Sequence, residues 1–147
     1  MAKITADTGG LDAFINGTKG LIGDIGNIAD EMLDESAPTV VDAWKKNIRA
    51  AADRVDDYGR PYSTGALEES IKATKAKTNA YGHFVAARPT GEDARGTRNG
   101  EKMAYLEYGT SKQVAHPTMA KTVAETEKEV TEKMTKTFEK NVDKYLK

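Results

Sequence analysis

The sequence has no cysteine among its 147 residues. Disulfides, thiolate metal sites, iron–sulfur clusters and cysteine catalysis are therefore excluded. It also has no long apolar run, so no segment is predicted to span a bilayer. The N-terminal residues lack the cationic start and apolar stretch of a signal peptide. Together these absences predict a protein that is made and folded in a reducing cytoplasm.

Apolar residues make up 38% of the chain and charged residues 31%, which fits one globular domain over residues 1–147. The net charge of −1 is unevenly distributed. Residues 1–59 carry 6 basic and 11 acidic side chains (net −5), whereas residues 60–118 carry 9 and 6 (net +3). This distribution suggests complementary, polar surfaces, for instance between copies of the chain. It argues against nucleic acid as the main partner, because phosphate binding needs a concentrated basic face.

No catalytic pattern is recognisable in the sequence. His83 and His116 lie far apart and outside any metal-binding motif. Gly96 and Gly100 lack the strand–loop–helix context of a phosphate-binding loop. We therefore expect no enzymatic activity, no metal and no cofactor.

Two segments near the N-terminus carry apolar residues at alternating three- and four-residue steps, which is typical of one helix face. The first seam is Leu11, Phe14, Thr18, Leu21, Ile25, Ile28 and Met32, and the second is Val41, Trp44, Ile48, Ala51 and Val55. Ser36 can cap a helix and Pro38 fits a first turn, so two helices or one kinked helix are predicted over 10–34 and 37–56.

Four glycines interrupt the first seam, at Gly17, Gly20, Gly23 and Gly26. Each costs an interior helix position about 1 kcal/mol relative to alanine, so this helix needs a partner surface. Two interpretations stay open: a tertiary helix with close, glycine-lined contacts, or a segment that orders or shifts on assembly.

The remainder of the chain predicts a small sheet and a final helix. Residues 64–70 resemble a short helix capped by Thr64, and residues 71–88 two strands joined by a turn at 81–82. Residues 89–102 contain no large apolar side chain, which predicts a mobile loop with no anchor to the core. Residues 103–108 fit a strand or a short helix.

The last predicted helix begins at Pro117 and packs on the sheet, with a charged, solvated outer face. The apolar residues of this helix are predicted to face one way: Met119, Val123, Val130, Met134, Phe138 and Val142. The expected fold class is therefore α+β. It comprises a flexible terminus (1–9), a helical arm (10–56), a sheet with a loop (60–118) and a C-terminal helix (117–147).

Two segments carry a resemblance to a known family. The first runs Pro61-Tyr-Ser-Thr-Gly-Ala-Leu-Glu-Glu-Ser-Ile71, and the second runs Met103-Ala-Tyr-Leu-Glu-Tyr-Gly-Thr110 and is followed by His116-Pro117. This order resembles the morphogenesis proteins of long-tailed phages, namely tail-completion, tail-terminator and head–tail joining proteins. The resemblance covers roughly residues 10–147. Met119 stands where that family usually has an aromatic residue.

The resemblance implies a structural virion protein that forms a ring, with a hexamer as the first expectation, at the phage neck or tail end. Implied partners are the tail tube protein and a head-connector or neck protein, with no membrane, and with DNA contact only through the ring lumen. The candidate contact residues are Thr64, Gly65, Leu67, Tyr105, Glu107, Tyr108, Gly109, Arg95 and Arg98.

Two other interpretations remain open. One is a helical adaptor, unrelated to phages, that forms a coiled coil through the seams at 11–32 and 41–55. The other, ranked lower, is a nucleic-acid binder that uses the basic residues of the middle segment. Those residues are Lys72, Lys75, Lys77, Arg88, Arg95 and Arg98.

Overall fold

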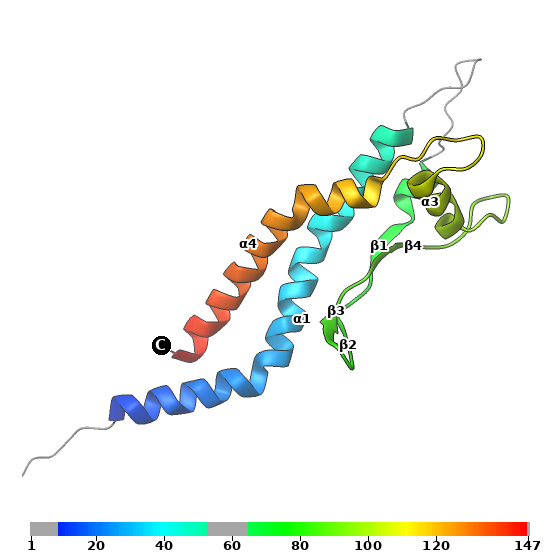
Figure 1. Ribbon diagram of the computed structural model, residues 1–147. Coiled ribbons are helices and arrows are strands. Elements are labelled where there is room, and N and C mark those ends of the chain that lie inside the picture. The colour runs from blue at the N-terminus through cyan, green and yellow to red at the C-terminus, as the bar shows by residue number, and fades with distance from the viewer. Residues whose placement is uncertain (1–8, 53–64, 147) are drawn as a thin grey trace, which may run out of the picture.

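The computed structural model describes residues 9–52 and 65–146. Its elements are α1 (Gly9–Ala52), α2 (Ala66–Glu69), β1 (Ile71–Ala73), β2 (Lys77–Asn79), β3 (Gly82–Phe84), β4 (Ala87–Pro89), α3 (Asn99–Tyr108) and α4 (Thr118–Leu146). The predicted α+β class is confirmed: two long helices run side by side, and a narrow β-hairpin lies along α1 (Figure 1).

α1 is one helix that passes through Pro38, so of the two predicted alternatives the single helix is found and the pair of helices is not. Ser36 does not cap a second helix; its buried hydroxyl donates to the Met32 carbonyl at 2.6 Å. Contacts to α4 hold α1 on both sides of the proline. Thr137 donates to Glu35, and the Lys133 ammonium donates to Thr39 at 2.6 Å. These contacts offset the backbone hydrogen bond that a proline removes from a helix interior.

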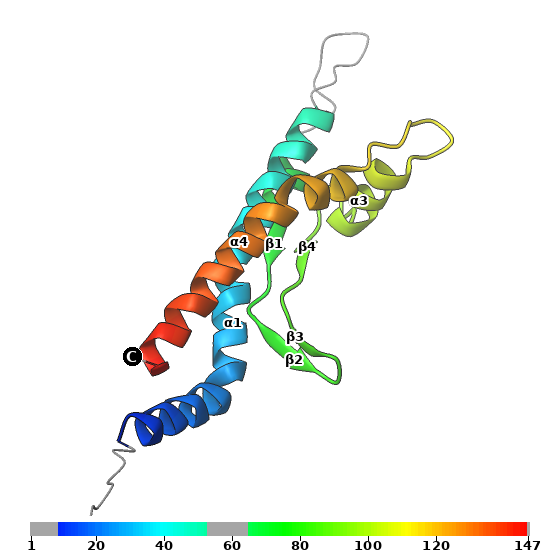
Figure 2. The ribbon, with the colours of Figure 1, turned by 60° about the vertical axis from the view of Figure 1, so that its left-hand side comes forward.

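The N-terminal part of α1 turns away from the direction of the remainder, in the stretch that carries the glycines (Figures 1 and 2). The last turn of α4 lies against this stretch. A Cβ on Gly17 would overlap the Tyr145 carbonyl oxygen, and one on Gly20 would come within 3.1 Å of the Tyr145 ring. Two of the four glycines therefore provide the close helix contact that the sequence predicts, whereas Gly23 has nothing within 4 Å.

α4 packs antiparallel to α1, and α1 lies between α4 and the hairpin (Figure 1). The prediction that α4 packs on the sheet is therefore wrong. The predicted apolar side of α4 is covered only in part: Met119 packs against the core and Val130, Met134 and Val142 are half-buried, whereas Val123 is 62% exposed. The buried side of α4 consists of small polar residues: Thr118, Thr122, Thr126, Thr137 and Asn141.

Threonine hydroxyls can be buried on α4 because each has a hydrogen-bond partner, either in its own helix or on α1 or α3. Thr122 donates to the Thr118 carbonyl at 2.7 Å, and Thr126 donates to the Thr122 carbonyl at 2.8 Å. α1 adds hydrogen bonds across the interface: Trp44 Nε1 donates to Thr118 Oγ1 and Asn47 Nδ2 to Thr122 Oγ1, both at 3.0 Å. The helix pair is thus joined through polar groups that have partners.

The hairpin is an antiparallel ribbon in two parts, with β1 paired to β4 and β2 paired to β3. Residues 74–76 of one side oppose residues 85–86 of the other, which is a β-bulge. Two contacts fasten the ribbon to α1. The Ala76 amide donates to Asp34 at 3.0 Å, and His83 Nδ1 lies 2.7 Å from Asp30.

The hydrophobic core lies at one end of the molecule, where the C-terminal half of α1 meets β1, α3 and the start of α4. Its buried members are Val41, Trp44, Ile48, Ile71, Met103 and Leu106. The second predicted seam, as far as it is described, thus forms the chain's own core. Its residues Val41, Trp44 and Ile48 cannot also form a coiled coil with another chain.

Candidate functional site

The described residues of the first motif include the short helix α2 and hold it against the rest of the chain. Thr64 lies outside the described residues. Gly65 precedes the helix with φ 79°, a conformation that glycine adopts without strain. Leu67 is partly buried against the core, and the Ser70 hydroxyl donates to its carbonyl at 2.6 Å. Glu68 pairs with Arg49 of α1, whose hydrogen bond lowers the pKa of the carboxyl. Leu67 therefore acts within the chain.

The second motif lies on α3, which settles the ambiguity between strand and helix at 103–108. Met103 and Leu106 are buried, whereas Tyr105 and Tyr108 are 49% and 75% exposed. Exposed tyrosines offer apolar area with a polar end, a combination common in protein interfaces. These two residues remain candidates for contact with a partner.

Glu107 cannot be a contact residue of the predicted kind, because its carboxylate is buried inside the chain. It accepts hydrogen bonds from Thr118 Oγ1 at 3.2 Å, from the Met119 amide at 3.0 Å and from the Ala120 amide at 3.4 Å. The first amides of a helix have no partner within the helix and carry partial positive charge. Glu107 therefore fixes the start of α4 against α3.

Gly109 makes the sharp turn that the sequence predicts. Its φ is 75°, and a Cβ would lie 2.8 Å from both the Gln113 carbonyl oxygen and the Ala115 amide nitrogen. The following loop folds back on α3, where the His116 amide donates to the Leu106 carbonyl at 2.7 Å. Only glycine fits here, so the residue has a structural role within the chain.

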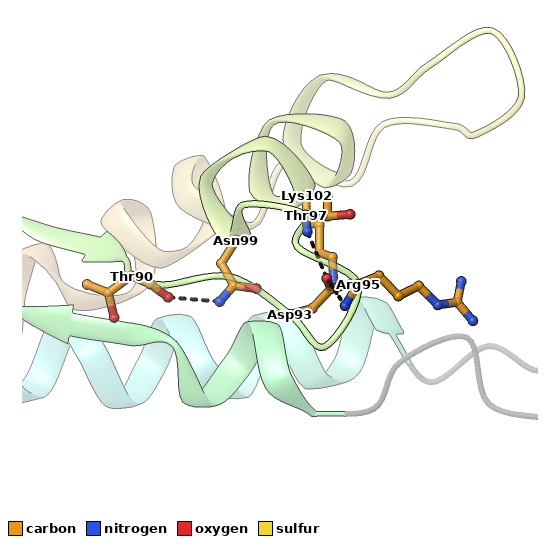
Figure 3. A network of polar contacts seen from close by, with 6 residues as sticks. All are labelled: Thr90, Asp93, Arg95, Thr97, Asn99 and Lys102. Carbon is orange, nitrogen blue, oxygen red and sulfur yellow. Dashed lines mark hydrogen bonds and ion pairs between the residues drawn. The ribbon is translucent and has the colours of Figure 1, made fainter.

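The predicted mobile loop at 89–102 is shorter and more ordered than expected. Residues 99–102 form the first turn of α3, and Asp93 closes the rest (Figure 3). Its carboxylate accepts from the amides of Arg95 and Thr97, both at 2.9 Å, and from the ammonium of Lys102. Asn99, which is buried, donates to the Thr90 carbonyl at 2.8 Å. The expectation of a segment without anchors is wrong.

These hydrogen bonds stabilise the charged form of Asp93. The bond from Lys102, followed by that from the Thr97 amide, lowers the pKa of the carboxyl from 3.8 to about 2. The side chains of Arg95 and Arg98 stay exposed on this loop. Both remain candidates for contact with a partner.

Some acidic side chains of α1 find cationic partners within the chain, so the charge distribution does not by itself point to a contact between copies. Asp34 lies 3.7 Å from the Lys75 ammonium, and Glu31 lies 3.0 Å from that of Lys140. Glu31 also accepts from Asn141, and these bonds lower the pKa of its carboxyl. The acidic side of α1 is thus mostly engaged by the hairpin and α4.

The described part of the chain also leaves a stripe of apolar side chains exposed. The exposed residues of the N-terminal part of α1 recur at helical spacing on one side, and we call this stripe the arm face. The arm face consists of Leu11, Phe14, Ile15, Ile22 and Ile25. The first predicted seam located part of it, because the same periodicity marks a face whether the partner is internal or external.

The threonine face of α4 was missed, although the sequence carries a signal for it. Thr118, Thr122 and Thr126 recur every four residues, and Thr137 and Asn141 repeat the same step. A search for apolar periodicity passes over such a pattern, because it treats threonine as polar and therefore external.

Other site types find no support among residues 9–52 and 65–146. No group of three or more potential metal ligands is present there. Within the same ranges, no helix combines the length and apolar character needed to cross a bilayer. Comparison with known protein families, curated proteins and solved structures finds no match to this chain.

Proposed function

We propose that this chain is a structural virion protein that assembles into a ring at the neck or tail end of a long-tailed phage, completing the tail and joining it to the head. The element order supports the proposal. A long helix, a hairpin and loop, a helix bearing Tyr105 and Tyr108, and a proline-led final helix follow one another as the resemblance implies.

The observation that carries the assembly part is the exposed apolar surface. Among the described residues, thirteen large hydrophobic side chains are exposed and seven hydrophobic side chains are buried. Five of the exposed ones form the arm face. Contiguous apolar surface on a soluble chain marks a site of association. The surface that drives assembly is therefore apolar, which revises the polar interface expected from the charge distribution.

The geometry favours a repeating contact between unlike surfaces. The arm face lies on α1, whereas α4 exposes the separate apolar side chains Val123, Phe138 and Leu146, at 62%, 37% and 39%. A contact between two different surfaces of one chain is heterologous, and it forms a ring when the rotation between neighbours closes. We propose that the arm of one copy lies on α4 of the next.

The assembly test is the mass of the protein, measured by light scattering over a range of concentrations. The wild-type mass should rise to one closed multiple of the monomer. The double variant F14D/I22D should stay monomeric, because it places two carboxylates on the arm face. The matched control, A13D/N16D, adds the same charge on the opposite, exposed side of the helix and should assemble like wild type.

The phage part is tested by labelling virions. Antibodies against this chain should mark the head–tail junction of particles from the phage that encodes it, and portal, capsid and tail genes should lie beside its gene. Label along the whole tail, or virions without the chain, would refute the neck assignment. A wild-type chain that stays monomeric at every concentration and on isolated tail tubes would refute the ring.

A further inference from the structure

The charged side chains of the hairpin all have the same sign. From residue 71 to residue 91 the sequence contains no aspartate or glutamate but has four cationic side chains: Lys72, Lys75, Lys77 and Arg88. This surplus stands out in a chain whose net charge is −1.

Strand alternation places three of these cations on the side away from α1. Ile71 enters the core, and His83 contacts Asp30 of α1. Because successive side chains of a strand point to opposite faces, the neighbours of those residues point outward. The resulting hairpin outer face comprises Lys72, Lys77, Phe84 and Arg88, all exposed.

Two of the cations oppose each other directly. Lys72 and Arg88 are register partners in the β1–β4 pair. Like charges at such positions destabilise a hairpin. Neither residue has an ion-pair partner among the described residues, whereas Lys75 is paired with Asp34. The outer face therefore keeps a repulsive pair that an external anion would relieve.

We propose that the hairpin outer face binds the phosphate backbone of duplex DNA once copies of the chain are assembled. This inference rests on the proposed ring, in which a hairpin from every copy would reach the DNA that passes through. A two-stranded ribbon bearing outward cations and no acid can approach the duplex without meeting charge of the same sign.

The acidic side of α1 in a second copy fits the hairpin less well. The carboxylates of α1 that lie near the hairpin or α4 are engaged within the chain, as described above. The described acids of α1 that lack a partner there are Asp12 and Asp42. Thirty residues of helix separate them by about 45 Å, so they cannot together face one hairpin.

Assembly decides the strength of this contact. Three cations on one chain neutralise few phosphates, so a single copy binds weakly at physiological salt. Linking several hairpins in one ring makes the later contacts intramolecular and raises the overall affinity without new chemistry. DNA binding should therefore appear together with the assembled species.

The experiment measures binding of the full chain to a fluorescent duplex of about 20 base pairs across a range of salt concentrations. The test variant is K72Q/K77Q/R88Q, and the control, K19Q/K112Q/K136Q, removes three exposed cations elsewhere. The test variant should lose at least about tenfold in affinity at low salt, and its salt slope should fall by about 2–3 per bound copy. The control variant should keep most of the affinity and most of the salt slope. Both triple variants should have a melting temperature equal to or above that of the wild type.

The remaining outcomes overturn the proposal or separate it from the ring. Equal losses in both triple variants would mean that net charge, not the hairpin, attracts DNA, and an absence of wild-type binding would also refute it. If K72Q/K77Q/R88Q fails to assemble without DNA, the outer face binds another copy instead. If rings form normally but do not bind DNA, this inference is refuted and the proposed ring stands. If the chain stays monomeric and still binds DNA through the hairpin, the proposed ring is refuted and the contact between hairpin and DNA stands.

Discussion

The two halves of α1 use apolar residues in opposite ways. In the C-terminal half, Val41, Trp44 and Ile48 are buried against the hairpin base and α3. In the N-terminal half, Leu11, Phe14 and most of the arm face are exposed, and only Ile28 is buried. Both halves carry the same three-and-four spacing. Apolar periodicity therefore identifies a helix face without telling whether the chain itself covers it.

The two halves of α1 also differ in the contacts that hold them in place. The core half holds the folded monomer together through apolar burial. The arm half is held to α4 by polar pairs, such as Tyr145 with Asp24 at 2.6 Å, and its apolar side, the arm face, is exposed. Stability and assembly should then respond to different substitutions, and four experiments test that separation.

The largest difference is expected between two identical substitutions. Ile48 is 0% exposed and Ile22 is 67% exposed. I48A should lower the free energy of unfolding by about 2–5 kcal/mol, because it leaves a cavity in the core. I22A should change monomer stability by no more than about 0.5 kcal/mol. Urea denaturation at a monomeric concentration measures both, and similar losses would abolish the distinction between the halves.

The second experiment tests the link between the core and α4. E107Q keeps the shape of the side chain but removes the charge that accepts from Thr118 and the Met119 amide. It should cost about 1.5–3 kcal/mol, the range for hydrogen bonds to charged groups. E101Q, on the exposed side of α3, is the control and should be nearly neutral. An unchanged stability in E107Q, together with lost assembly, would restore the interface role first predicted for Glu107.

The third experiment compares two glycines of the arm. G23A meets nothing within 4 Å and should stabilise the helix by about 0.5–1 kcal/mol. G17A gains the same propensity but drives its methyl group into the Tyr145 carbonyl, so the end of α4 must move. G17A should therefore be less stable than G23A by about 1–3 kcal/mol. Equal melting temperatures would mean that the end of α4 is not held on the arm.

The smallest effect is expected at the loop between β4 and α3. Because the folded pKa of Asp93 is about 2 rather than 3.8, its stabilising contribution is complete above pH 3.8 and is lost as the pH falls through about 2. The stability difference between wild type and D93N should therefore shrink over that interval. K102M should raise the pKa of Asp93 in an NMR titration. A difference independent of pH would show that Asp93 does not hold the loop through its charge.

Prediction from sequence succeeded where a local rule decides the outcome. The hairpin, its turn near Gly82 and the sharp bend at Gly109 follow from alternation and from glycine's conformational freedom. It failed where distant residues compete. Pro38 left open whether one or two helices form, which contacts to α4 decide. The loop after β4 was predicted to lack anchors because it has no large apolar side chain, whereas Asp93 and Lys102, nine residues apart, close it through a polar contact.

The sequence by itself determined the two long helices, the hairpin with its cationic side chains and the apolar stripe near the start of the first helix, because propensity, alternation and periodicity are properties of neighbouring residues. Only the tertiary structure decided which faces are covered. It turned the threonines of α4 toward α1, buried Glu107 beneath the start of α4, and left the arm face exposed. The physical reason is that burial depends on which elements meet. The threonine hydroxyls could be buried because they find acceptors in their own helix and on α1 and α3, and the end of α4 approaches α1 closely because Gly17 and Gly20 have no side chains.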